Sequence, residues 1–234
     1  MHLDATEVSG VTNGSIVTPS LAPPGFTGTV VVASGGSVNF APAQLGNGVY
    51  FLNCCANNTA YYRFNGAAIG NIFNINQGQI SFYLKSRYNL ANRPTGARVV
   101  FDVRDGDPNN HLFHFVTDVA TVGSERYLLF RYRVGNTAIP ATTYVDYFFY
   151  VDDDVADTLF GNGVVLKVGI TWDGSITKLF LNDVNVQASS YTKTVPNWTG
   201  ASIFDLGAYE YLNLGGYNST DDIIDEFTVI GPGV

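Results

Sequence analysis

Short runs in which apolar and polar residues alternate occupy most of the chain. They are rich in Val, Ile, Phe and Tyr, the residue types that favour a pleated, half-buried strand. The clearest runs are Gln79–Arg87, Arg98–Arg104, His111–Thr117, Arg126–Arg133, Tyr144–Val151, Val164–Trp172 and Thr177–Leu181. No stretch keeps a 3.6-residue apolar period over three turns, and Ala156–Gly161 is only a weak helical candidate. The pattern predicts an all-β sandwich or barrel.

Turn sequences separate these runs, among them Asp173-Gly174-Ser175 and Asn182-Asp183. No linker, long charge run or internal repeat interrupts the series. The 234 residues, 46% of them hydrophobic, suffice for one large domain with a full core. We therefore expect a single domain over residues 1–234.

Charge narrows the choice of partner. The chain carries 12 Lys and Arg against 20 Asp and Glu, a net charge of −8. This balance opposes general nucleic-acid binding, which rests on neutralising phosphates. No run of eighteen apolar residues predicts membrane insertion, and Met1-His2-Leu3-Asp4 does not resemble a signal peptide. Many aromatic residues and glycines with few charges are typical of an extracellular β-protein.

Strand alternation sorts the mid-chain side chains onto two faces. If the consecutive mid-chain strands belong largely to one sheet, its outer face carries a strip of polar and aromatic groups. The strip comprises Tyr83, Lys85, Asp102, Arg104, His114, Arg131, Tyr144 and Asp146. Residues 79–133 hold eight Lys and Arg against five Asp and Glu. Most of the positive charge of the chain therefore gathers on one candidate face.

Two interpretations of this face stay open. It is either an ordinary solvated sheet face with cross-strand ion pairs or a sugar-binding face. Arg beside Asp supplies rigid donors and acceptors for hydroxyl groups, and aromatic rings stack on sugars. The excess of positive charge hints at acidic sugars. Trp198, in loop-rich sequence, is a further candidate for stacking.

The C-terminal third carries a family pattern. Val164–Val186 contains strand, Asp-Gly turn, strand, Asn-Asp turn and short strand, followed by Phe204-Asp205-Leu206-Gly207 and then by Ile223–Phe227. This series resembles the laminin-G-like jelly rolls of the concanavalin A-like lectin/glucanase superfamily. Asn182-Asp183 stands where the family usually has Asn-Gly, and Phe227 where it usually has Val. The resemblance implies a jelly-roll sandwich of two antiparallel sheets in a secreted bacterial protein.

Several functions occur on this fold. The closely spaced glutamates of its glucanases are missing, since Glu7, Glu125, Glu210 and Glu226 are not spaced in that way. A polysaccharide lyase could use arginines, His114 and a tyrosine, but the lyase motif strings are also missing. The sequence therefore favours a non-catalytic polysaccharide-binding module, either a monomer or part of a larger secreted protein. A lyase or hydrolase and a cell-surface adhesion domain remain the alternatives.

Carboxylates cluster in Asp221–Glu226, where Asp221 and Asp222 lead from a loop into the last predicted strand. Strict alternation places Asp225 and Glu226 on opposite faces and puts Phe227 on the side of Asp225, which argues against a catalytic pair. In the superfamily a carboxylate on this strand often binds a structural Ca²⁺ together with backbone carbonyls, and Asp225 matches that position. The alternative is a hydrogen bond from Asp225 to a loop. The adjacent Cys54-Cys55 are either two thiols or a strained vicinal disulfide.

Overall fold

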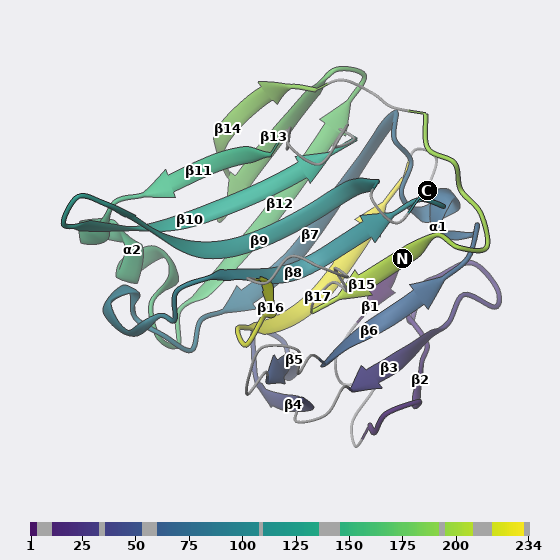
Figure 1. Ribbon diagram of the computed structural model, residues 1–234, viewed down its shortest axis with the longest axis horizontal. Coiled ribbons are helices and arrows are strands. Elements are labelled where there is room, and N and C mark those ends of the chain that lie inside the picture. Colours follow the sequence, from purple (N-terminus) through teal and green to yellow (C-terminus); the bar gives the residue numbers. More distant parts are fainter. Residues whose placement is uncertain are drawn as a thin grey trace.

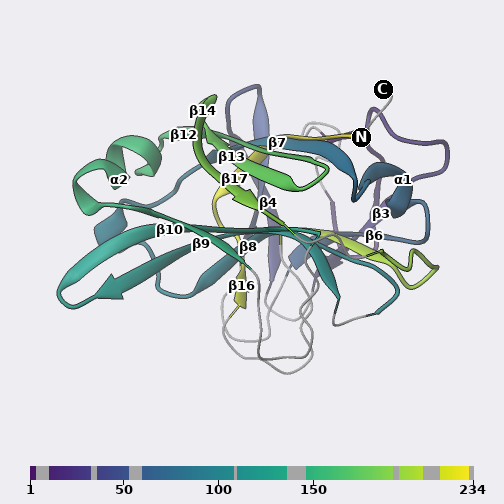
Figure 2. The same ribbon diagram turned by 90° about the horizontal axis from the view of Figure 1, so that it is seen from above.

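The computed structural model describes residues 1–3, 11–32, 36–52, 60–107, 110–135, 146–191, 195–207 and 217–231 (Figure 1). Cys54-Cys55 and Tyr144 lie outside these residues. The described chain forms two stacked β-sheets, seen as two layers in Figure 2. The predicted all-β sandwich of two antiparallel sheets is therefore confirmed.

One sheet contains eight of the described strands. Its order is β14 (Val184–Ser190), β13 (Ile176–Leu181), β12 (Val165–Asp173), β7 (Gln77–Lys85), β17 (Ile223–Ile230), β5 (Asn47–Leu52) and β4 (Ser37–Pro42), with β1 (His2–Leu3) paired to β17. The turn between β13 and β14 is Asn182-Asp183, and both residues have positive φ, 49° and 66°. This is the geometry of a two-residue type I′ hairpin, which tolerates Asn and Asp.

The second sheet contains nine of the described strands. Its order is β11 (Tyr147–Val151), β10 (Glu125–Val134), β9 (His111–Val122), β8 (Ala97–Arg104), β15 (Ile203–Leu206), β6 (Ala60–Asn65), β3 (Gly28–Val32) and β2 (Ile16–Val17). The short β16 (Tyr217–Ser219) pairs with β8 in parallel. β6 and β15, which come from distant parts of the chain, thus lie beside the mid-chain strands.

Aromatic side chains from both sheets meet in the core. Phe82 of one sheet lies 5.9 Å from Phe101 and 5.3 Å from Phe115 of the other, measured between ring centroids. Phe227 stacks on Phe82 at 5.6 Å. Trp172 is also buried, and its indole N–H donates to the Asn74 carbonyl at 2.7 Å. The alternating apolar positions of the strands therefore fill one interior between the sheets.

The strand β7 corrects one sequence expectation. It pairs with β12 and β17, so it belongs to the eight-stranded sheet, whereas β8, β9, β10 and β11 belong to the nine-stranded sheet. The expectation that these consecutive strands share one sheet is wrong for β7. The chain crosses between sheets after β7, and such a crossing leaves no trace in local alternation.

The strand β17 corrects another expectation. Asp225 pairs with Tyr83 and Thr228 with Ser81, so two residues of β17 oppose one residue of β7 between them. Glu226 takes up this extra position with a φ of 53°, as in a β-bulge. The bulge reverses the alternation, so that Phe227 faces the core while Asp225 stays on the outer face. The predicted sharing of one side by Asp225 and Phe227 is therefore wrong.

Helices are few and short in the described chain. They are α1 (Ile69–Ile72), the 3₁₀ turn η2 (Leu90–Asn92) and α2 (Asp153–Phe160), and none is long and apolar enough to span a membrane. In α2, Asp153 and Asp154 occupy the first turn, where the helix dipole favours acidic groups. Ala156 and Phe160, four residues apart, form its buried face. The weak helical candidate is thus a two-turn helix that begins earlier.

Candidate functional site

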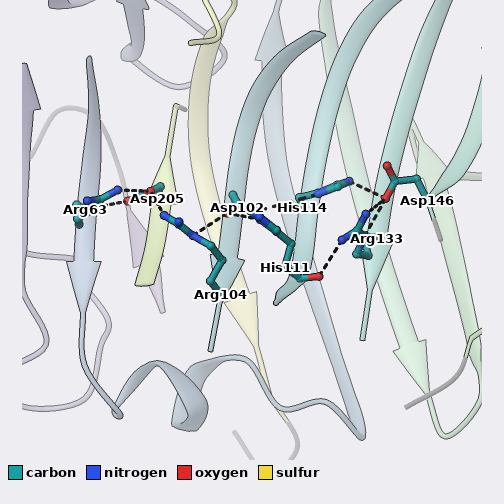
Figure 3. Close-up of polar contacts among 8 residues, drawn as sticks. All are labelled: Arg63, Asp102, Arg104, His111, His114, Arg133, Asp146 and Asp205. Atoms are coloured by element: carbon teal, nitrogen blue, oxygen red, sulfur yellow. Dashed lines mark hydrogen bonds and ion pairs between the residues drawn. The ribbon is translucent and has the colours of Figure 1, made fainter. Parts of the chain in front are cut away.

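A row of charged side chains crosses the outer face of the nine-stranded sheet (Figure 3). Directly opposed positions on five neighbouring strands form most of it, and the last member precedes β11. The row consists of Arg63, Asp205, Asp102, His114, Arg133 and Asp146. We call it the charged row. Its members come from distant parts of the sequence, and only the strand order β10-β9-β8-β15-β6 places them side by side.

Two aspartates occupy directly opposed positions within the charged row. Such a pair of like charges destabilises a sheet unless a cation lies between them. Arg104 supplies that cation: its Nη2 lies 3.1 Å from Asp205 Oδ2 and its Nε lies 3.3 Å from Asp102 Oδ2. Arg63 holds Asp205 from the other side with a two-pronged contact, at 2.8 and 2.7 Å. Arg63 and Arg104 thus allow two buried carboxylates to sit side by side.

Histidines continue the network beyond Asp102. His111 Nδ1 lies 2.8 Å from Asp102 Oδ1. His114 lies between two carboxylates, with Nε2 3.1 Å from Asp146 Oδ1 and Nδ1 3.9 Å from Asp102 Oδ1. Arg133 binds the same Asp146 oxygen with Nε at 2.8 Å and Nη2 at 2.7 Å. One connected polar network therefore runs from β6 to the start of β11.

Burial and neighbouring charges set the protonation of this network. Burial lowers the pKa of His114, although Asp146 opposes the effect. Burial alone would raise the pKa of Asp146, but His114, Arg133 and Arg131 outweigh it and bring that pKa well below its usual range. The pKa of Asp102 is likewise lowered on balance, because His111 and Arg104 outweigh burial. For Asp205 burial prevails and raises the pKa against the effect of Arg63.

Exposed aromatic rings lie beside one end of the charged row. Phe148 pairs with Arg131, and Tyr150 with Leu129, so both rings project from the same outer face as Arg131. Phe148 is 42% exposed and Tyr150 is 51% exposed. Tyr127 approaches Tyr150 edge to face at 6.3 Å. We call Tyr127, Phe148 and Tyr150 the aromatic platform. Arg131 links it to the row, with Nε 3.5 Å from Asp146 Oδ2.

The structure brings together five of the residues singled out from the sequence. They are Asp102, Arg104, His114, Arg131 and Asp146, all in or against the charged row. Tyr83 and Lys85 lie on the other sheet, where Lys85 Nζ donates to the Pro42 carbonyl at 2.8 Å. Trp198 packs against Gly70 next to the core, away from the row. The last candidate, Tyr144, falls outside the described residues.

Other members of the site were not selected from the sequence. Arg63 and Asp205 lie on strands whose pairing with the mid-chain strands is not local. Asp205 stands within the Phe204–Gly207 motif, which indicates fold rather than a site. Phe148 did carry a usable signal, since Asp146, Phe148 and Tyr150 alternate on one face of the predicted strand.

Asp225 lies on the outer face of the eight-stranded sheet. It is buried, and its Oδ2 accepts a hydrogen bond from the Leu45 backbone N–H at 2.9 Å. Among the described residues, no three His, Cys, Asp or Glu side chains gather as a possible metal site. The neighbouring carboxylates bind other side chains. Asp222 accepts hydrogen bonds from both Nη atoms of Arg93, and Asp221 forms an ion pair with Arg98 and accepts a hydrogen bond from Tyr88. The observed contact matches the loop-anchoring alternative for Asp225.

Comparison with solved structures identifies sandwiches of the same fold. The binding domain of botulinum neurotoxin serotype D/C is 14% identical with a TM-score of 0.59, over 98% of this chain and 47% of that one. Botulinum neurotoxin type C, whose cell entry depends on interaction with two ganglioside molecules, is 14% identical with a TM-score of 0.55, over 88% and 44%. At such identities the likeness establishes a concanavalin A-like fold alone. The chain spans less than half the length of each toxin chain.

A third solved structure is domain 4 of an extracellular arabinanase from Geobacillus stearothermophilus, in complex with arabinotriose. It is 17% identical with a TM-score of 0.49, over 88% of this chain and 84% of that one. No protein-family model matches the sequence, and no curated protein matches it.

Proposed function

We propose that the protein is a non-catalytic carbohydrate-binding domain that binds its glycan on the outer face of the nine-stranded sheet, at the aromatic platform. The observation that carries the proposal is the exposure of Phe148 and Tyr150 beside Arg131, which Asp146 holds in place. Sugar rings present C–H faces that pack on aromatic rings, and hydroxyl groups that bond to charged side chains. A platform at the end of a fixed polar network supplies both.

The buried network holds side chains in place beside the aromatic platform and does not present a catalytic base to a substrate. His114 is 7% exposed and already lies between two carboxylates, so its ring is not presented to a polymer. A general base must reach a proton of the bound substrate within hydrogen-bond distance. The lyase alternative needs such a base at the surface, and His114 does not provide it. Its neighbours instead hold Asp146 and Arg131 in one geometry next to the rings.

The balance of charge at this face favours a neutral glycan. Each arginine of the network faces a carboxylate: Arg63 and Arg104 face Asp205, and Arg131 and Arg133 face Asp146. The excess of arginine and lysine in residues 79–133 is therefore largely compensated by partners from elsewhere in the chain. We propose a neutral polysaccharide in place of the acidic one suggested by the local sequence.

The outer face of the other sheet is the competing location. Tyr83 and Lys85 were candidates there, beside Asp225. Lys85 is engaged by a loop carbonyl, and no residue of that face combines an exposed ring with an Arg–Asp pair among the described contacts. Tyr83 therefore offers a matched control for the aromatic platform.

The test is affinity electrophoresis and calorimetry against neutral polysaccharides (arabinan, xylan, β-glucan) and acidic ones (alginate, polygalacturonate). We expect binding to at least one neutral polymer. Phe148→Ala and Tyr150→Ala should each weaken it about tenfold or more, the range of an aromatic anchor. Tyr83→Ala should leave it unchanged. Absorbance of unsaturated uronate, followed in the same samples, should stay flat.

Three outcomes would contradict the proposal. Absence of binding to every polymer would remove the carbohydrate function. Loss of binding in Tyr83→Ala but not in Phe148→Ala would move the site to the other sheet. A rise in uronate absorbance would make the protein a lyase, as the enzymatic alternative holds.

Three finer assignments belong to the same proposal. The hairpin and terminal-strand motifs support a laminin-G-like member of the fold, and the composition supports a secreted protein. A structural Ca²⁺ at Asp225 would need backbone carbonyls as further ligands, because the described carboxylates do not gather there. If calcium binds, excess EGTA should lower the melting temperature of the wild type but not of Asp225→Asn. An unchanged melt in EGTA would leave Asp225 as a loop anchor through Leu45.

A further inference from the structure

An apolar groove opens where the edges of the two sheets meet. Its volume is about 610 Å³, within the range of ligand-binding pockets. Seven apolar side chains line it, together with Tyr150 and the polar residues Asp152, Thr158 and Asn182. The apolar residues are Phe149, Val151, Val155, Leu159, Leu181, Val184 and Val186. The lining residues thus come from β11 and α2 on one side and from the β13–β14 hairpin on the other.

Two contacts show that the sheet edges converge at one end and part at the other. Tyr147 Oη donates to the Ser190 carbonyl at 2.8 Å, and Gln187 Nε2 donates to the Phe148 carbonyl at 3.2 Å. These contacts join the start of β11 to the end of β14. The groove is lined by the end of β11 and the start of β14. The groove is therefore a wedge between two strand edges.

Both edges are open in the described part of the chain. There β11 pairs only with β10, and β14 only with β13. An edge strand offers backbone N–H and C=O groups that can pair with another extended chain. At the rim of the wedge, Val184 is 62% exposed and Val155 is 49% exposed. Apolar side chains and open strand edges together suit an extended peptide.

The charge around the groove indicates which charge a bound peptide would carry. Among the described residues that line the groove, none is a lysine or an arginine. Asp152 lines it directly, and Asp153 and Asp154 follow, exposed, in the first turn of α2. Lys167, near the hairpin turn, is neutralised by Asp183 at 2.7 Å. The rim is therefore negative, and it complements positive charge on an occupant.

We propose that this groove binds an extended peptide segment of another protein, in which apolar side chains alternate with lysine or arginine. The apolar side chains occupy the wedge, the basic ones face Asp152–Asp154, and the peptide backbone pairs with an open strand edge. The segment adds a strand between the two sheets. Tyr150 borders both this groove and the proposed glycan site. The residues that decide the test, Val155 and Val184, do not belong to the aromatic platform.

The experiment is selection of a phage-displayed library of random twelve-residue peptides on the immobilised protein, with counter-selection on Val184→Lys. Val184 is exposed, so this variant should keep the melting temperature of the wild type. We expect enriched peptides with alternating apolar residues and a net positive charge. A synthetic copy should bind Val184→Lys and the double variant D153K/D154K at least about tenfold more weakly than the wild type. Ile176→Lys, at the far end of β13, is the matched control and should bind like the wild type.

Several results would overturn the proposal. They are a selection without enrichment, enrichment of acidic peptides, and peptides that bind Val184→Lys as tightly as the wild type. Light scattering that detects a dimer dissociated by Val184→Lys would assign the groove to a second copy of the chain instead. Glycan binding by Val184→Lys, measured in parallel, should equal that of the wild type, which separates failure here from failure of the carbohydrate proposal.

Discussion

Asp102 lies at the centre of the charged row. It is fully buried and contacts Arg104 and His111, with His114 close by. Its carboxylate therefore holds together polar side chains of two neighbouring strands, β8 and β9. A buried network of this kind is stable only while each member keeps its partners, because an isolated buried charge is costly.

Replacing Asp102 by Asn should reveal this dependence. The variant keeps the shape of the side chain but leaves Arg104 and His111 without their shared carboxylate. We expect a loss of about 3–5 kcal/mol in the free energy of unfolding, the usual cost of breaking a buried pair. Urea unfolding followed by tryptophan fluorescence measures it. Asp183→Asn is the control, because it breaks the surface ion pair between Lys167 and Asp183. The Asp183 side chain is 74% exposed, so this variant should lose at most about 1 kcal/mol in the free energy of unfolding. Equal losses in the two variants would contradict the role given to Asp102.

At this scale the sequence predicted part of the site. Alternation alone places Asp102, Arg104, His114 and Arg131 on outer faces, because the period of two is a local property. Arg63 and Asp205 could not be found in this way. They join the row only through pairing of β15 with β6 and β8, and pairing between distant segments is not encoded in local pattern.

The bulge in β17 shows, at the scale of an element, that local alternation does not predict every feature of a strand. Regular alternation places Phe227 on the side of Asp225, and one extra residue, Glu226, moves it to the core. The positive φ of Glu226 is uncommon for a non-glycine residue. Composition and alternation give no warning of such an insertion. The mid-chain strands and the hairpin at Asn182-Asp183 were predictable, because their causes are local, whereas the short helix was placed only in its later part.

Matched deletions in β17 should separate the bulge from the regular strand. Without Glu226, Asp225 would still face outward, Phe227 would still face the core opposite Phe82, and Thr228 would still pair with Ser81. We expect this deletion to keep a cooperative thermal melt within a few degrees of the wild type. Deleting Thr228 instead moves Val229 from the core to the outer face, since each side chain beyond it changes face. That variant should lose its cooperative melt in circular dichroism. The reverse ranking would show that the bulge is required and that the pairing assigned to β17 is wrong.

For the whole molecule, the feature that matters most is the separation of charge between the buried network and the edge of the sandwich. The buried network gathers arginines with aspartates, while the exposed carboxylates of Asp152–Asp154 lie at the sandwich edge beside the groove. The excess of negative charge, −8 for the chain, therefore lies mainly on the surface. Inside the network, protonation rather than salt should govern stability, since buried pairs are weakly screened.

Stability should consequently fall as the pH is lowered. The pKa of His114 is lowered in the folded protein. Below about pH 6.5, His114 therefore binds a proton in the unfolded chain more readily than in the native state. This contribution is fully present above pH 6.5 and is lost as the pH falls below it. The lowered pKa values of Asp102 and Asp146 act in the same direction below about pH 4. Only Asp205, whose pKa is raised, acts in the opposite direction, just above about pH 4.

Urea unfolding at pH 7.5, 6.0, 5.0 and 4.0 measures this dependence. We expect the free energy of unfolding to decline already between pH 6.5 and 5, before the aspartates titrate. His114→Gln should remove that upper stage, because glutamine does not titrate, while the decline below pH 4 remains. His2→Gln is the control, since His2 lies at the surface beside Glu226 and outside the charged row. A wild-type stability that is constant from pH 7.5 to 5.0, or an upper stage that persists in His114→Gln, would show that His114 is not held neutral by its burial between Asp102 and Asp146.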